Sequence, residues 1–83
     1  MKKTVRSETY KLLGEDPVRF QNKSQIALNI GITGSDFQRF FSGRNLLRVT
    51  TLTQIAKYFK LDIGDVIAEH TKNVDKYEKE ENK

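Results

Sequence analysis

The sequence predicts an all-α protein, a compact domain of five short helices followed by a charged tail. Apolar residues recur at the three- and four-residue spacing of helices in several segments, and no segment alternates apolar and polar residues convincingly as a strand does. Glycines and capping residues stand between these segments, where helices end and begin. The 83 residues make one small domain, and a hydrophobic content of 36% requires an efficiently packed core.

The first helix is predicted over residues 4–13. One buried stripe follows helical spacing and contains Val5, Thr9, Leu12 and Leu13. Gly14 would end this helix, because glycine adopts the left-handed conformation at little cost.

The connection to the second helix begins with Asp16 and Pro17. A capping carboxylate followed by proline at the first helical position indicates a fresh helical start. We expect at most a turn or two here, with Val18 and Phe20 packed inward.

The second helix is expected to begin after Asn22, whose side chain would cap it together with Gln25. Its apolar side consists of Ile26, Ala27 and Ile30. Gly31 would end the helix, and Ile32 would fill the turn that follows.

The third helix is predicted over Gly34–Ser42, directly after that turn. Thr33 would cap it, and the negative charge of Asp36 in the first turn suits the helix dipole. Its apolar side consists of Phe37, Phe40 and Phe41. Gly43 would close the helix. The second and third helices are the pair that the rest of the chain is expected to hold.

The fourth helix is predicted to start with a cap at Thr50 or Thr51 and to reach Phe59 or Lys60. Its core positions are Leu52, Ile55, Ala56 and Phe59.

A fifth helix would be capped by Asp62, with Asp65 in its first turn. We expect Val66 and Ile67 to be buried. Beyond Ala68 the chain is largely charged and polar, so this tail is either a helical extension or disordered. The predicted division is therefore a domain over residues 1–69 and a charged tail over residues 70–83.

The composition argues against several function classes. There is no cysteine, and the single histidine, His70, is expected to be solvated near a helix end, so neither a disulfide nor a zinc site is expected. The sequence contains neither a phosphate-binding glycine loop nor a nucleophile with a plausible base, so we expect no enzyme and no cofactor. No apolar run approaches the length of a membrane span, which leads us to expect a soluble, cytoplasmic protein without a membrane partner.

The positive charge is concentrated outside the tail. The net charge is +4, and the last sixteen residues hold four lysines and five acidic residues, so the rest carries 11 basic and 6 acidic residues, a net of +5. A small basic body attracts polyanions, either nucleic acid or an acidic membrane surface.

The order of these signals resembles the XRE, or phage-repressor-like, helix-turn-helix family. The resemblance covers about 46 of the 83 residues. The residues that carry it are Ile26-Ala27, Gly31-Ile32-Thr33, Phe37, Phe40, Gly43, Leu52, Ile55-Ala56, Leu61-Asp62 and Val66-Ile67. The resemblance implies a five-helix, lambda-repressor-like domain that binds operator DNA, commonly as a dimer, with helix 34–42 in the major groove. This sequence differs from the family at Phe41, where an acidic residue is common, and at Gly34, where relatives often carry a base-reading side chain.

Candidate DNA-contacting residues follow from the family correspondence and from the polar side of helix 34–42. The base-reading candidates are Arg39, Gln38, Ser35, Gly34 and Thr33. Arg39 is the strongest of these, because a guanidinium can donate two parallel hydrogen bonds to guanine. The candidates for phosphate contacts are Lys23, Ser42, Arg44, Asn45 and Arg48. Phosphate contacts position a protein without carrying sequence information.

A second hypothesis is a protein-interaction module on the same scaffold, such as an antirepressor or a subunit of a regulatory complex. Gly34 and Phe41 favour it, and Phe41 would either pack on the connection before the second helix or be exposed for a partner. Arg39 could also be an ordinary solvated residue. Val74 and Tyr77 in the tail are candidates for a homodimer contact.

Overall fold

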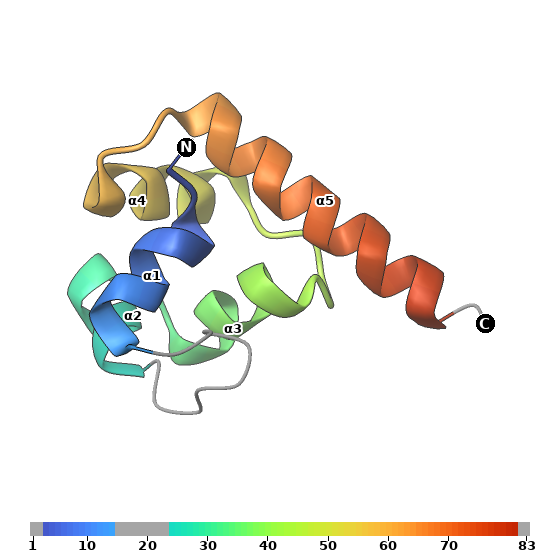
Figure 1. The fold of residues 1–83 in the computed structure, drawn as a ribbon, viewed down its shortest axis with the longest axis horizontal. Coiled ribbons are helices and arrows are strands. Elements are labelled where there is room, and N and C mark those ends of the chain that lie inside the picture. The colour runs from blue at the N-terminus through green and yellow to red at the C-terminus, as the bar shows by residue number, and fades with distance from the viewer. Residues whose placement is uncertain (1–2, 15–23, 82–83) are drawn as a thin grey trace.

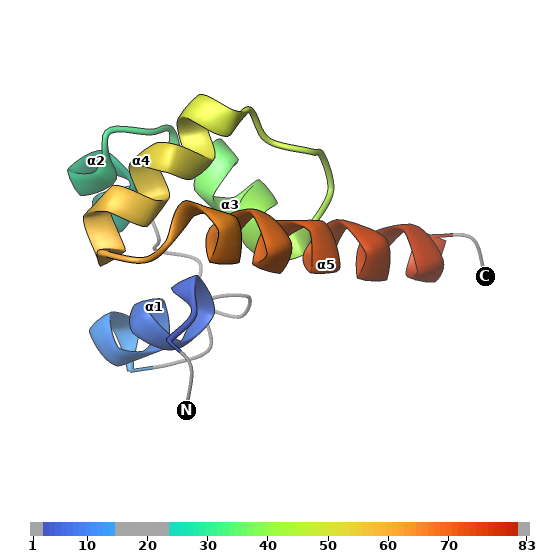
Figure 2. The same ribbon diagram turned by 90° about the horizontal axis from the view of Figure 1, so that it is seen from above.

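The computed structural model describes residues 3–14 and 24–81, and these form five α-helices and no strand. The helices are α1 Val5–Leu13, α2 Ser24–Ile30, α3 Gly34–Ser42, α4 Val49–Phe59 and α5 Ile63–Glu81. The all-α class and the five helices expected from the sequence are therefore confirmed for this part of the chain. The four shorter helices gather around the N-terminal half of α5, and the C-terminal half of α5 projects beyond them (Figures 1 and 2).

One apolar cluster holds the helices together. α4 packs against α1, α2 and α5, while α3 packs against α2 and α5. α3 supplies three phenylalanines, and the ring of Phe41 meets those of Phe37 and Phe40 edge to face, with centroids 5.0 and 5.3 Å apart. The other members of the cluster are Val5, Ile26, Ala27, Leu52, Ile55, Ala56 and Val66. Burial of a large apolar side chain contributes about 1.5–3 kcal/mol, so the three phenylalanines fix which side of α3 faces the core.

The predicted helix boundaries are largely formed as expected. Gly14 and Gly43 end α1 and α3 in the left-handed conformation. The Thr33 hydroxyl accepts a hydrogen bond from the amide three residues later at 3.1 Å, and the Asp62 carboxylate accepts one from the amide two residues later at 2.8 Å. The predictions for Asp16, Pro17, Val18, Phe20, Asn22 and Lys23 lie outside the described residues.

The buried stripe of α1 is shorter than predicted. Val5 and Thr9 are fully buried, but Leu12 is 59% exposed. Leu12 lies in the last turn of α1 and lines a surface hollow together with Tyr58. The prediction that Leu12 is buried was wrong, because the neighbouring Leu13 is the residue that packs against the core at this end of the helix.

α4 begins at Val49, so the predicted caps at Thr50 or Thr51 are also wrong. Arg48 is the N-cap residue, with an extended backbone and no side-chain hydrogen bond to the helix. The backbone amide of Leu52 donates to the carbonyl of Arg48 at 3.1 Å, so the helical hydrogen bonds already begin ahead of the two threonines.

α5 continues without a break beyond Ala68 to Glu81, so the described part of the tail adopts the helical alternative of the two that the sequence left open. Its buried side contains Val66 and His70, each fully buried, which are spaced by one turn. Ile67 lies one residue away from that stripe and is 37% exposed. Two predictions were wrong here: Ile67 is not buried, and His70 is a core residue rather than a solvated one.

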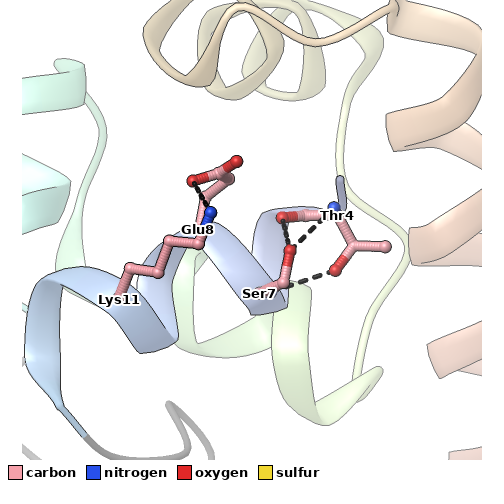
Figure 3. Close-up of polar contacts among 4 residues, drawn as sticks. All are labelled: Thr4, Ser7, Glu8 and Lys11. Carbon is pink, nitrogen blue, oxygen red and sulfur yellow. Dashed lines mark hydrogen bonds and ion pairs between the residues drawn. The ribbon is translucent and has the colours of Figure 1, made fainter. Parts of the chain in front are cut away.

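The N-terminus of α1 is capped both locally and by α5. Figure 3 shows the local cap, in which the amide of Ser7 donates to the Thr4 hydroxyl at 3.0 Å and the amide of Thr4 donates to the Ser7 hydroxyl at 2.9 Å. The amides of Val5 and Arg6 donate to the two carboxylate oxygens of Glu69 on α5, at 2.8 and 3.1 Å. All the amides that a helix start leaves unpaired are thus bonded, and a carboxylate there also suits the helix dipole.

α5 crosses the end of α3 at very close range. Gly43 has a φ of 74°, and it is buried. A Cβ placed on Gly43 would overlap the backbone carbonyl of Asn73 and the amide nitrogen of Val74. The end of α3 is therefore held against the backbone of α5, which fixes the position of the helix that carries the candidate site.

Candidate nucleic-acid interface

α3 is a two-sided helix whose polar side faces outward. Phe37, Phe40 and Phe41 are at most 4% exposed, so their side of α3 is in the core. The opposite side carries the exposed residues Ser35, Gln38, Arg39 and Ser42. This arrangement agrees with the predicted division of the helix. It also removes the alternative in which Phe41 is exposed for a partner.

Arg39 is the central cation of this polar side and has an acidic neighbour. Its Nη1 atom lies 3.4 Å from Oδ1 of Asp36, one turn earlier in α3. The two side chains are 44% and 32% exposed. Exposed ion pairs contribute about 0–1 kcal/mol, so Arg39 can exchange this carboxylate for a stronger acceptor at little cost. The carboxylate meanwhile restricts where the guanidinium points.

Two surface hollows meet at Arg39. The first lies along α3 and continues into the following loop; it is lined by Ser35, Gln38, Arg39, Ser42 and Arg44. The second lies between α3 and the start of α4; it is lined by Asp36, Arg39, Asn45, Leu46, Leu47, Arg48, Thr50 and Thr51. Together the hollows contain three arginines and one aspartate, a net charge of +2. The fold therefore gathers most of the predicted contact residues into one basic surface around Arg39.

The basic loop (residues 44–48) is fixed to α5 on its inner side, through the buried His70. The amide of Leu47 donates a hydrogen bond to Nε2 of His70 at 3.0 Å. The other ring nitrogen of His70, Nδ1, lies 3.4 Å from the carbonyl oxygen of Phe40, and the Asn73 side-chain amide donates to the same carbonyl at 2.9 Å. The imidazole is stacked on the Phe40 ring, with centroids 5.2 Å apart. α5 thus holds the last turn of α3 and the basic loop through two neighbouring side chains.

The histidine is held in its neutral form. Burial lowers the pKa of His70 below its ordinary value near 6.5, against the opposing effect of backbone hydrogen bonds from Phe40 and Asn45. Because the unfolded chain then binds more protons than the folded one below that pH, His70 stabilises the fold above pH 6.5 and lowers its stability as the pH falls.

The remaining predicted contact residues lie at the ends of this surface. Thr33 is exposed, but its hydroxyl already caps α3. Gly34 is half-buried at the first position of α3. Lys23 lies outside the described residues.

Sequence reasoning missed Leu46, Thr50 and Thr51, which line the second hollow. The misplaced start of α4 concealed the two threonines. The pairing of Asp36 with Arg39 could have been found, because their separation of three residues places both on one helix face.

A comparison with protein-family models, curated proteins and solved structures finds no match to this chain. None of the helices in the described ranges is both long enough and apolar enough to cross a membrane.

Replacing Gly34 with alanine is expected to leave the fold intact and to raise its free energy of unfolding by up to about 1 kcal/mol. A Cβ at Gly34 would lie 3.7 Å from Cβ of Ser24, which is ordinary van der Waals contact. Urea unfolding followed by circular dichroism measures the change. A loss above 1 kcal/mol would contradict the expectation, because it would show that the packing of α2 on α3 requires glycine.

Proposed function

We propose that this protein is a sequence-specific DNA-binding regulator of the phage-repressor type, in which α2 and α3 form a helix-turn-helix and α3 enters the major groove. The proposal rests on the resemblance of residues 22–67 to the XRE family and on one structural observation. That observation is the exposed polar side of α3, with Arg39 at its centre and arginines of the basic loop beside it.

The dimensions and charge of this surface suit duplex DNA. An α-helix with its side chains is about 10–12 Å across, close to the roughly 12 Å width of the major groove. In this proposal Arg39 reads guanine, Gln38 and Ser35 lie beside it, and Thr33 and Gly34 bring the start of α3 close to the bases. Arg44 and Arg48 are exposed at the flank, where a guanidinium can bind phosphate.

The remaining phosphate contacts complete the proposed footprint. Lys23, Ser42 and Asn45 are assigned to the backbone beside the groove. If two copies bind as a homodimer, they would read half-sites about 34 Å apart. Regulation would follow from occupancy of the operator.

The test of the proposal is a titration with a random pool of DNA duplexes at two salt concentrations. A preferred sequence and a steep loss of affinity with salt are expected, because phosphate contacts release counterions. Failure to bind any duplex at low salt would overturn the proposal.

Replacing Arg39 with alanine is expected to relax discrimination at one base pair of the selected site by about 1–3 kcal/mol. The reason is that a bidentate contact to guanine carries sequence information. The matched control is Arg44→Ala, which should weaken binding to all sequences alike and lower the salt slope by about 1. Affinity measurements on the selected site and its single-base variants separate the two effects. If the Arg39 variant instead loses affinity equally for every sequence, Arg39 contacts phosphate rather than a base.

The second candidate is a protein-interaction module, and one observation favours it. Leu46 and Val49 are 72% and 64% exposed, beside the hollow that contains Arg39. Large apolar side chains at a polar rim are a feature of protein interfaces. In that case, Leu46→Ser would disrupt a complex with a regulatory protein, and Arg39→Ala would leave that complex unchanged.

A further inference from the structure

The strongest unexplained feature outside the polar side of α3 is the fully buried imidazole of His70. An ordinary core position would hold an apolar side chain, because a buried polar group costs free energy unless it is hydrogen-bonded. Here both ring nitrogens face backbone groups, one in α3 and one in the basic loop. These two segments carry the proposed DNA contacts.

The bonds define which ring nitrogen carries the proton. A backbone amide can only donate, so Nε2 of His70 must accept from Leu47 with an unprotonated lone pair. The proton of the neutral ring is then on Nδ1, which faces the carbonyl of Phe40. The same carbonyl also accepts from Asn73. The two contacts therefore respond differently when the ring gains a proton.

Protonation would remove one of these contacts and keep the other. A second proton occupies Nε2 and turns the acceptor for Leu47 into a donor, so two N–H groups would face each other. Nδ1 would still donate to Phe40, and Asn73 would still hold that carbonyl. The Leu47 amide of the basic loop would be released while the last turn of α3 stayed in place.

We infer that His70 is a positioning residue for the proposed DNA-binding surface, and that it holds the Leu47 segment of the basic loop in place only while its ring is neutral. This inference rests on the proposed function for its effect on DNA, but its effect on the loop does not depend on DNA. Arg44 and Arg48 lie in or directly beside the loop segment anchored through Leu47. Release of that segment would thus loosen the flanking phosphate contacts and leave Arg39 on its helix.

Within residues 3–14 and 24–81, the charged side chains of the elements packed against His70 are exposed or partly exposed. The elements packed against it carry Asp36 and Arg39 on α3, Arg44 and Arg48 at the loop, and Lys57 on α4 with Lys60 directly after it. The first two are partly exposed in the surface hollows, and the other four are exposed. Lys72, two residues after His70 on α5, is exposed as well.

Glu69, next to His70 on α5, has partners of its own, because its carboxylate is bonded to the amides that begin α1. Within the basic loop, the backbone of Asn45 also forms a hydrogen bond with the imidazole, which opposes the effect of burial on the pKa of His70. The contact that needs the neutral ring is therefore the one made by the Leu47 amide.

The direct test follows the Leu47 amide by nuclear magnetic resonance in isotope-labelled protein while the His70 ring is titrated from pH 8 to pH 5. We expect the protection factor of the Leu47 amide against hydrogen exchange to fall at least about tenfold as His70 gains its proton. The amide of Ile55, in the core of α4, should keep its protection. Unchanged protection of Leu47, or a parallel loss at Ile55, would overturn the inference.

Two variants separate positioning from packing. His70→Gln supplies an acceptor and a donor that do not titrate, so Leu47 should stay protected over the whole pH range. His70→Phe keeps an aromatic ring beside Phe40 but lacks the acceptor, so Leu47 should be unprotected at every pH. If the phenylalanine variant does not fold, the wild-type titration and the glutamine variant still decide the question.

The DNA measurement uses the duplex selected from the random pool, at constant salt. A proton on His70 adds positive charge, which alone would strengthen binding to DNA. We expect the opposite, a fall in affinity of about tenfold relative to His70→Gln as the pH is lowered through the range in which the His70 ring gains its proton, since the segment around Leu47 no longer holds its phosphate contacts in place. Equal pH dependence in the two proteins would overturn the inference. If no duplex binds at any pH, the proposed function fails, and the Leu47 result still reports on the loop.

Discussion

Replacing Gly43 with alanine is expected to lower the free energy of unfolding by about 2–5 kcal/mol. Two effects combine at this position. A residue with a Cβ is strained by about 1–2 kcal/mol in the left-handed conformation, which Gly43 adopts with a φ of 74°. In addition, the new methyl group would overlap the backbone of Asn73 and Val74 in α5, which cannot rotate away as a side chain would. The loss is large beside the 5–15 kcal/mol of a typical domain.

Gly14 offers a matched control for this experiment. Its φ of 75° is nearly the same as that of Gly43, but a Cβ placed on it would have no neighbour within 4 Å among the residues that the structure describes. Gly14→Ala should therefore show only the conformational strain, about 1–2 kcal/mol. Urea unfolding of both variants gives the contribution of the close approach as their difference. Equal losses would show that α5 can shift away from the end of α3 at no cost.

Replacing Glu69 with alanine is expected to lower the free energy of unfolding by about 1.5–3 kcal/mol. The substitution removes two hydrogen bonds, from the amides of Val5 and Arg6, and both are made to a charged acceptor at a helix N-terminus. It also breaks the polar link between α1 and α5, so the loss should be accompanied by weaker protection of the α1 amides against hydrogen exchange.

Two further variants define the origin of that loss. Glu69→Gln keeps one carbonyl oxygen as an acceptor and removes the charge, so about half of the loss is expected. Glu78→Ala changes an exposed glutamate of the same helix and should stay within about 0.5 kcal/mol of the wild type. If Glu69→Ala has no larger effect than Glu78→Ala, water replaces the carboxylate fully at the start of α1.

The features that depend on neighbouring residues were predictable from the sequence. Thr33 and Gly43 mark the ends of α3 because capping and left-handed geometry are local preferences. The spacing of the phenylalanines likewise gave the core side of α3, and hence the outward position of Arg39. The exposure of these polar side chains follows from helical periodicity alone.

The features that the sequence concealed depend on distant partners. His70 stands in a charged and polar stretch and was predicted to be solvated, but its hydrogen-bond partners lie 23 and 30 residues earlier. The role of Glu69 depends on amides 63 and 64 residues earlier. No local pattern distinguishes these two side chains from the solvated residues around them. In the site, the start of α4 was misplaced because Arg48 occupies the N-cap position without any side-chain cap, which capping preferences do not indicate.

The carboxylate that completes the start of α1 has a consequence for the order in which the chain can fold. Glu69 lies 64 residues after Val5. While the polypeptide emerges from the ribosome, α1 is among the first elements to appear and α5 is the last of the described helices. The amides of Val5 and Arg6 at the start of α1 therefore stay bonded to water until synthesis has passed residue 69. Closing so long a loop carries an entropic cost that early contacts cannot offset, so α1 is expected to join the nascent domain late, although it is made first.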